Sequence, residues 1–423
     1  MFIAVWSIPI SMNLRIFFSS GLTRFMLVVV VWNLIYLLLG FIFAFGLNAK
    51  ITPLGEPPEW SNLDRFQESI SRTEFEDALT SIYCSRPEWW ATWIVVEEKK
   101  ARIRKAAGGD SWYDLRFKLS ADEISEGNRS AGKKLEGLVI ALDPGHIGGA
   151  WSKMERRHFS LGEDSPVREG DISLAVARLL VSRLQKLGAR PFLVREGLQP
   201  VTGRRPDDFR ENARVWADKT MGFDSNQTEE KEKRVEARAE LLFYRVDEIH
   251  ARARLINDSI RPDLVLCLHM NAAPWPDSEK QQLVQRNDYH ILINGCYMGG
   301  ELSYDDQRFE MLWRLLNRWG EPEQQLAESM GRAFAQVTSL PAFSYKGPNA
   351  LKIGEVPGVW ARNLLANRVY RCPVIFLEPY IANSQAIYPR VQKWIREGEC
   401  DGFGLVTEYA EAVLLGLQNW AAE

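Results

Sequence analysis

Apolar runs of strand length alternate with helix-length amphipathic stretches from Gly137 to the end of the chain. At least five runs have the length and apolar content of buried strands: 137–142, 189–196, 262–270, 289–298 and 373–381. Residues 171–188 carry apolar side chains on one helical face, and further helices fit at 246–260, 322–337, 389–397 and 403–421. This alternation predicts an α/β domain, 135–423, with a largely parallel sheet flanked by helices on both faces.

The pattern differs between residues 62 and 119. Apolar side chains recur there first at helix-like spacing, from Phe66 to Ile82. Two short strands are then expected at 92–98 and 111–119, separated by a basic turn. We interpret 62–119 as a small α+β module of unknown role, joined to the larger domain by a polar linker at 121–134.

Two insertions interrupt the alternation of strands and helices. Residues 198–245 are strongly charged and poor in apolar side chains, which favours a solvated helical extension over a lid. Residues 299–320 are rich in leucine and tryptophan. Core packing is the commoner fate of such side chains, but their place beside the sheet makes 299–320 the better candidate for a wall facing the substrate.

The N-terminal segment, 1–50, contains an uncharged apolar run at 25–47 that is long enough to cross a bilayer as a helix. Arg15 and Arg24 precede the run, whereas only Lys50 follows it before Glu56 and Glu59. The positive-inside rule therefore keeps the N-terminus in the cytoplasm and exports the rest. An uncleaved membrane anchor is favoured over a cleaved signal peptide, and either predicts a protein of the cell envelope that works on the outer side of the inner membrane.

Composition narrows the classes of function. The 423 residues suggest two or three structural units, and the net charge of -3 argues against nucleic acid as a partner. The five cysteines are scattered and form no C-x-x-C pair, which argues against a disulfide framework and against a cysteine zinc site.

Candidate chemistry gathers where the predicted strands end. His146 follows the first strand, His269 follows the third, Glu378 closes the last, and Glu169 precedes a predicted helix. One histidine at a strand end is more often a hydrogen-bonded loop residue than a ligand, but two at one edge of one sheet favour a metal site. Two imidazoles and one carboxylate are a common set of zinc ligands, and a second carboxylate can then transfer protons. His290 lies at a strand start, so we expect it at the opposite edge.

Four motifs together resemble one enzyme family. The segments LDPGHIGG, REGDISLAVARLL, RPDLVLCLHMNAA and CPVIFLEPYIAN are similar, in order and spacing, to the zinc-dependent N-acetylmuramoyl-L-alanine amidases that cleave bacterial peptidoglycan. The resemblance covers 135–423 apart from the insertions. It implies a mixed sheet, a Zn²⁺ ion held by His146, Glu169 and His269, and Glu378 as the catalytic carboxylate. The reaction implied is hydrolysis of the amide between the muramic acid lactyl group and L-alanine.

The chain departs from the family pattern at the rim of the site. Pro379 and Tyr380 follow Glu378 where the family usually has glycine and phenylalanine, and Ile147 stands where a glycine usually follows the first histidine. In some members an inserted helix blocks the zinc until an activator protein removes it, so an activator is a possible partner here. A zinc peptidase that cuts a stem-peptide bond and a non-catalytic peptidoglycan-binding protein are the alternatives.

Overall fold

The computed structural model describes residues 49–118, 135–221, 228–276, 281–398 and 404–423. The predicted membrane segment at 25–47 and the linker at 121–134 lie outside these residues. Within the described part of the chain, no helix is both long enough and apolar enough to cross a membrane. Residues Lys50–Glu423 form one compact unit.

A seven-stranded sheet is the centre of the α/β part, in the order β10-β11-β9-β12-β8-β4-β7. Its strands are β4 (Val139–Pro144), β7 (Arg190–Leu193), β8 (Leu264–Leu268), β9 (Tyr289–Ile293), β10 (Leu351–Lys352), β11 (Val359–Ala361) and β12 (Val374–Pro379). Strands β7, β4, β8 and β12 are parallel, whereas β9 runs antiparallel to β12. The sheet is therefore mixed and largely parallel.

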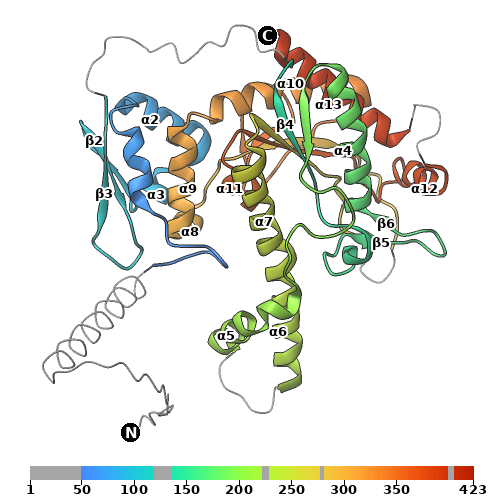
Figure 1. Cartoon of the computed structure of the whole chain (residues 1–423), viewed down its shortest axis with the longest axis horizontal. Helices are drawn as coiled ribbons and strands as arrows, with labels where there is room; N and C mark the ends of the chain where they lie inside the picture. The colour runs from blue at the N-terminus through green and yellow to red at the C-terminus, as the bar shows by residue number, and fades with distance from the viewer. Residues whose placement is uncertain (1–48, 119–134, 222–227, 277–280, 399–403) are drawn as a thin grey trace, which may run out of the picture. The chain divides into compact units, whose positions relative to one another are not determined.

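Helices cover both faces of the sheet because the central strands carry buried apolar side chains on both faces. Side chains such as Leu142 and Leu266 face one cluster and the alternating Ala141 and Val265 face another, as strand geometry requires. The first cluster includes side chains of α4 (Glu169–Lys186), α10 (Gly320–Thr338) and α13 (Leu405–Ala422). The second includes side chains of α7 (Glu248–Arg254) and α11 (Leu365–Val369). Figure 1 shows α4, α10 and α13 together on one side of the strands.

The first insertion is helical, as the sequence predicts. Helix α5 (Arg210–Met221) packs on α6 (Thr228–Leu242), and α6 continues into α7 through a wider, π-type segment at Phe243–Asp247. Figure 1 shows α6 and α7 along one line that leads away from the sheet, with α5 beside α6. The two helices enclose a small apolar core of their own, which includes Phe209, Val235 and Phe243.

Residues 60–117 form helical turns followed by a three-stranded antiparallel sheet. Its elements are η1 (Trp60–Phe66), α2 (Arg72–Ala78), η2 (Leu79–Tyr83), α3 (Pro87–Trp90), β1 (Ile94–Val96), β2 (Lys100–Arg104) and β3 (Trp112–Arg116). The prediction of a basic turn is wrong, because those residues form the middle strand, β2. Ala101 and Ile103 are buried, whereas Arg102 between them is more exposed, so the strand signal is an alternation of apolar and basic residues.

The second insertion packs against this module. Its helices α8 (Gly299–Leu302) and α9 (Asp305–Leu316) share an apolar core with η1 and α2. The Trp60 and Phe309 rings meet edge-on at 5.6 Å, as do the Phe66 and Trp313 rings. No residue of 299–320 lines the cleft described below, so the expectation of a wall facing the substrate is wrong.

The remaining elements are short or peripheral. They are η3 (Gly149–Ser152), β5 (His158–Phe159), β6 (Val167–Arg168), η4 (Pro206–Phe209), η7 (Leu255–Ile260) and α12 (Tyr388–Glu397). Strands β5 and β6 pair as a hairpin between β4 and α4, which places the chain from Arg157 to Arg168 beside the end of the sheet.

Candidate metal centre

Three parallel strands bring the chemistry to one edge of the sheet. His146 lies two residues beyond β4, His269 follows β8 directly, and Glu378 is the fifth residue of β12. Glu169 is the first residue of α4, which returns from the same edge. Since the carboxyl ends of parallel strands meet at one edge, the fold explains why residues far apart in sequence are neighbours.

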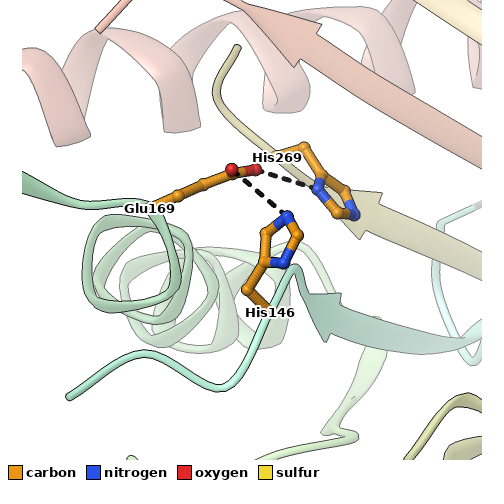
Figure 2. Close-up of side chains that lie close together, drawn as sticks. All are labelled: His146, Glu169 and His269. Atoms are coloured by element: carbon orange, nitrogen blue, oxygen red, sulfur yellow. Dashed lines mark hydrogen bonds and ion pairs between the residues drawn. The ribbon is translucent and has the colours of Figure 1, made fainter. Parts of the chain in front are cut away.

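His146, Glu169 and His269 converge. One carboxylate oxygen of Glu169 lies 3.2 Å from His146 Nε2, and the other lies 3.0 Å from His269 Nδ1 (Figure 2). One ligand atom from each residue lies within 4.8 Å of the others, so this group could hold a metal ion. We expected from the sequence that these three residues lie together, and they do so in the structure.

The loop that carries His146 is strained and firmly held. His146 has φ of 59°, in the left-handed region that a residue with a side chain rarely adopts. The buried guanidinium of Arg252 donates to the carbonyl oxygens of Pro144 at 2.7 Å and of His146 at 2.9 Å, and to the Asp143 carboxylate at 2.8 Å. These bonds fix the path of the backbone and hence the direction of the His146 ring.

Glycines near His146 make room for close approaches. A Cβ on Gly145 would lie 2.5 Å from the His269 ring, and a Cβ on Gly170 would lie 2.5 Å from the backbone nitrogen of Gly148. Ordinary contacts between such atoms are about 3.5–4.0 Å. Gly145 therefore lets the second histidine approach the first, and Gly148 and Gly170 let the loop lie against the start of α4.

Ile147 has a structural explanation. Its side chain is fully buried and belongs to the same apolar cluster as Phe209, Val235 and Phe243 of the α5–α6 insertion. The residue next to the first histidine thus anchors the inserted helices to the loop of the site. An isoleucine is favoured at this position because it supplies apolar surface to that core.

Glu155 is a part of the site that the sequence did not reveal. Its buried carboxylate accepts hydrogen bonds from the backbone nitrogens of Ile147 at 2.8 Å and Gly148 at 3.1 Å, and lies 3.6 Å from His146 Nδ1. Burial acts to raise the pKa of Glu155, but the bonds and the charge of His146 together lower it. A carboxylate behind a histidine fixes the ring and strengthens its other nitrogen as a ligand.

The charges of this cluster shift one another's pKa. Burial acts to lower the pKa of His146, but Glu169 and Glu155 outweigh it and raise the pKa to about 9. Burial acts to raise the pKa of Glu169, yet both histidines hold it well below its usual range. The arrangement favours a negatively charged Glu169 and a positive charge beside it.

Arg157 approaches the cluster from its open side. Its Nε lies 3.1 Å from His146 Nε2 and 3.2 Å from Glu169 Oε2. The side chain is 45% exposed, so it is free to turn toward solvent when another cation binds these atoms. Arg157 therefore competes with a metal ion for the same two ligand atoms.

Glu378 lies next to His269 across the β12–β8 pair, where Leu377 is opposite Leu268. The Tyr409 hydroxyl fixes the two strand ends, because it lies 3.0 Å from the His269 carbonyl oxygen and 3.1 Å from that of Leu377. Burial raises the pKa of Glu378, with the negative charge of Glu169 adding to the effect and His269 opposing it. A carboxyl group with a raised pKa is suited to taking up and releasing protons.

The sequence suggested that His290 lies at the opposite edge of the sheet, and this prediction is wrong. Strand β9 runs antiparallel to β12, which places His290 directly opposite Glu378 in the register. The strand start therefore lies at the same edge as the ends of β4, β8 and β12. The apolar pattern of 289–298 carries no signal for the direction of the strand, so this error could not be avoided from sequence.

A cleft of about 1010 Å³ contains His146, Glu169, His269 and Glu378. One side is formed by α6, α7 and the π-type segment between them, through residues that include Arg238, Tyr244 and Ile249. The first insertion is thus both a helical extension and a wall of the cleft.

No protein-family model and no curated protein sequence matches the chain. Similar solved structures exist. The N-acetylmuramyl-L-alanine amidase Ami1 from Mycobacterium smegmatis aligns with a TM-score of 0.37 and 16% identity, over 68% of this chain and 98% of that protein. The CwlD amidase from Clostridioides difficile, solved with the GerS lipoprotein, aligns with a TM-score of 0.36 and 14% identity, over 67% of this chain and 98% of that protein. The amidase AmiC2 of Nostoc punctiforme aligns with a TM-score of 0.34 and 14% identity, over 67% of this chain and 98% of that protein. The chain is thus similar to N-acetylmuramoyl-L-alanine amidases of known structure.

Proposed function

We propose that the protein is a zinc-dependent peptidoglycan hydrolase that cleaves the amide between the N-acetylmuramic acid lactyl group and L-alanine. One observation carries the proposal: His146, Glu169 and His269 form a two-histidine, one-carboxylate cluster, with Glu378 on the adjoining strand. This combination is suited to amide hydrolysis, and the four motifs that supply it resemble the amidase family.

The donor set fits zinc. Two imidazoles and one glutamate are an established catalytic zinc set that leaves a position open for water or substrate. The Glu155 carboxylate behind His146 is the type of supporting contact that zinc-binding histidines have. The buried cysteines lie outside the cluster, so the set has no thiolate that would favour a softer metal.

The mechanism we infer divides the chemistry between the ion and Glu378. A zinc ion held by His146, Glu169 and His269 would polarise the amide carbonyl and make water more acidic. Glu378 takes a proton from the attacking water and delivers it to the departing nitrogen of L-alanine. Arg252 and Glu155 hold the His146 loop throughout, so the ligands need no rearrangement as charge develops.

The cleft suits a polymer better than a small molecule. Its volume of about 1010 Å³ is at the upper end of small-ligand sites, which span about 300–1,000 Å³. Aromatic side chains such as Phe159 and Trp275, whose rings meet at 5.4 Å, offer apolar surface beside the catalytic groups. A glycan strand with its peptide is a ligand of this size and mixed polarity.

A peptidoglycan substrate agrees with the expectation from 25–47 that residues beyond Lys50 work in the cell envelope, on the outer side of the membrane. The anchor itself stays a prediction, as does an activator protein that acts on the α5–α6 wall.

The test replaces Glu378 with glutamine in the purified protein. We expect hydrolysis of purified cell walls to fall by about 10²- to 10⁴-fold, because general acid–base catalysis by one group contributes a factor in that range. Zinc content should stay near one ion per chain, since Glu378 is outside the ligand cluster. Wild-type activity in the Glu378→Gln variant would refute the catalytic role.

A further inference from the structure

The groups at the active edge of the sheet lie in strand order. His146 is on the β4 side, His269 follows β8, Glu378 is on β12 and His290 is on β9. Arg362 follows β11, which lies beside β9 and runs parallel to it, so the Arg362 backbone is at the other end of the strands, where its N–H donates to the Ile293 carbonyl. His290, Tyr345 and Arg362 all line the same cleft as the catalytic groups. The lining of the cleft therefore continues past Glu378, on the side away from the metal ligands, and the Arg362 side chain reaches it from the far end of β11.

His290 and Tyr345 form a buried polar pair next to Glu378. His290 Nε2 lies 3.1 Å from the Tyr345 hydroxyl, and His290 is only 3% exposed. Its other ring nitrogen, Nδ1, has no hydrogen-bond partner among the described residues. Burial, together with Arg286 and Arg362, lowers the pKa of His290 to about 3, so the ring is neutral at physiological pH. The neutral ring thus holds the Tyr345 hydroxyl through one nitrogen and has hydrogen-bonding capacity left on the other.

Arg362 adds an uncompensated positive charge. Its guanidinium lies 5.7 Å from the centre of the Tyr345 ring. No carboxylate of the described residues forms an ion pair with Arg362. Arg286, the other cation near His290, differs because its Nη2 donates to Asp288 at 3.0 Å and it does not line the cleft. An arginine without a carboxylate in a cleft is suited to an anionic ligand group.

We propose that Arg362, with Tyr345 and His290, forms a subsite for a carboxylate on the second or third residue of the peptide that leaves the reaction. The inference rests on the proposed function. In that reaction the scissile carbonyl faces the metal ligands and the departing nitrogen faces Glu378, so the peptide continues toward β9 and β11. Strand β9 is one strand spacing, about 5 Å, from β12, and Tyr345 links His290 on β9 to the Arg362 side chain, a span that an extended peptide of about three residues covers.

The experiment compares two synthetic substrates with the zinc-loaded, full-length protein. Both are N-acetylmuramoyl tripeptides that begin with L-alanine. In one, the second and third residues carry free carboxylates, and in the other these are neutral carboxamides. We expect the wild type to hydrolyse the carboxylate substrate with a kcat/KM about 10- to 100-fold higher, the range of one charge-assisted hydrogen bond. Arg362→Gln should abolish this preference by slowing the carboxylate substrate while leaving the carboxamide rate within about threefold.

Arg286→Ala is the matched control, because it removes a neighbouring cation that Asp288 already neutralises, and it should retain the preference. Equal kcat/KM for the two substrates in the wild type would overturn the subsite while leaving the amidase function intact. Equal losses on both substrates in Arg362→Gln would also overturn it, since they indicate a structural role. Failure of the wild type to cleave either substrate, when it is also inactive on cell walls, would refute the proposed function itself.

Discussion

Replacing Gly145 with alanine adds one methyl group at the most crowded point of the candidate metal centre. The new Cβ would lie 2.5 Å from the Nδ1 and Cε1 atoms of the His269 ring. Gly145 is not among the glycines with positive φ, so alanine fits the backbone and the effect is purely steric. Ordinary contacts need about 3.5–4.0 Å, so the ring must retreat by about 1 Å or more.

That displacement is large compared with what a metal site tolerates. The distance between a metal ion and a ligand atom varies by only about 0.2 Å, so His269 cannot both avoid the methyl group and keep its place as a ligand. The ring has little freedom to tilt, because it stacks on Phe376 with centroids 5.2 Å apart and contacts Glu169 at 3.0 Å. We expect zinc affinity to fall by at least about 100-fold, which corresponds to about 2.7 kcal/mol.

Competition with a chromogenic chelator measures the zinc affinity, and circular dichroism with thermal unfolding of the metal-free protein checks the fold. Gly203→Ala is the control, because a Cβ there meets nothing within 4 Å and the backbone φ is not positive. The two variants should have the same secondary structure, and only Gly145→Ala should lose zinc. Unchanged zinc affinity in a folded Gly145→Ala protein would refute the assignment of His269 as a ligand.

Three further variants test other parts of the site. Arg157→Ala should bind zinc about 3- to 30-fold more tightly than the wild type, because it removes a cation that competes for His146 and Glu169. Calorimetry measures this affinity, and unchanged or weaker binding would contradict the competition. Ile147→Ala should lower the free energy of unfolding by about 2–5 kcal/mol, because it leaves a cavity in the core that joins the inserted helices to the site. Denaturant titrations measure this change, and a loss below about 1 kcal/mol would show that the contact is dispensable. Glu155→Gln should weaken zinc binding by about 10- to 100-fold, and equal affinity would exclude a role for Glu155 in orienting His146. Because folding lowers the pKa of Glu155, its carboxylate stabilises the protein above the unfolded pKa of about 4.3 and ceases to do so as pH falls through the folded value. The difference in unfolding free energy between wild type and Glu155→Gln should therefore shrink below about pH 4, and a difference that stays constant down to pH 3 would exclude this linkage.

The sequence predicted the cluster because its signals are local. His146, His269 and Glu378 each stand at the end of an apolar run, and parallel strands bring such ends together whatever lies between them. Glu169 lies just before an amphipathic helix, where an acidic residue is common, so its role as a ligand was implied only by the resemblance to the amidase family. The positions of the other three residues needed only the order of strands and helices, which periodicity supplies.

The features that were missed depend on three-dimensional pairing. The direction of β9 decides which edge holds His290, and an apolar strand reads the same in either direction. Glu155 lies in a short loop rich in charged residues, and nothing in its neighbours distinguishes a buried carboxylate from a solvated one. Ile147 looked like a departure at the rim, but its role depends on the inserted helices that pack on it.

The most direct test of the account follows the oxygen atom that hydrolysis adds. Purified peptidoglycan would be digested by the zinc-loaded protein in ¹⁸O-labelled water and the products analysed by mass spectrometry. We predict one ¹⁸O atom in the lactyl carboxylate of the sugar strand and unlabelled peptides with a free N-terminal L-alanine. Label in a carboxyl group of the stem peptide instead, with the lactyl–alanine amide intact, would contradict it and would identify a peptidase.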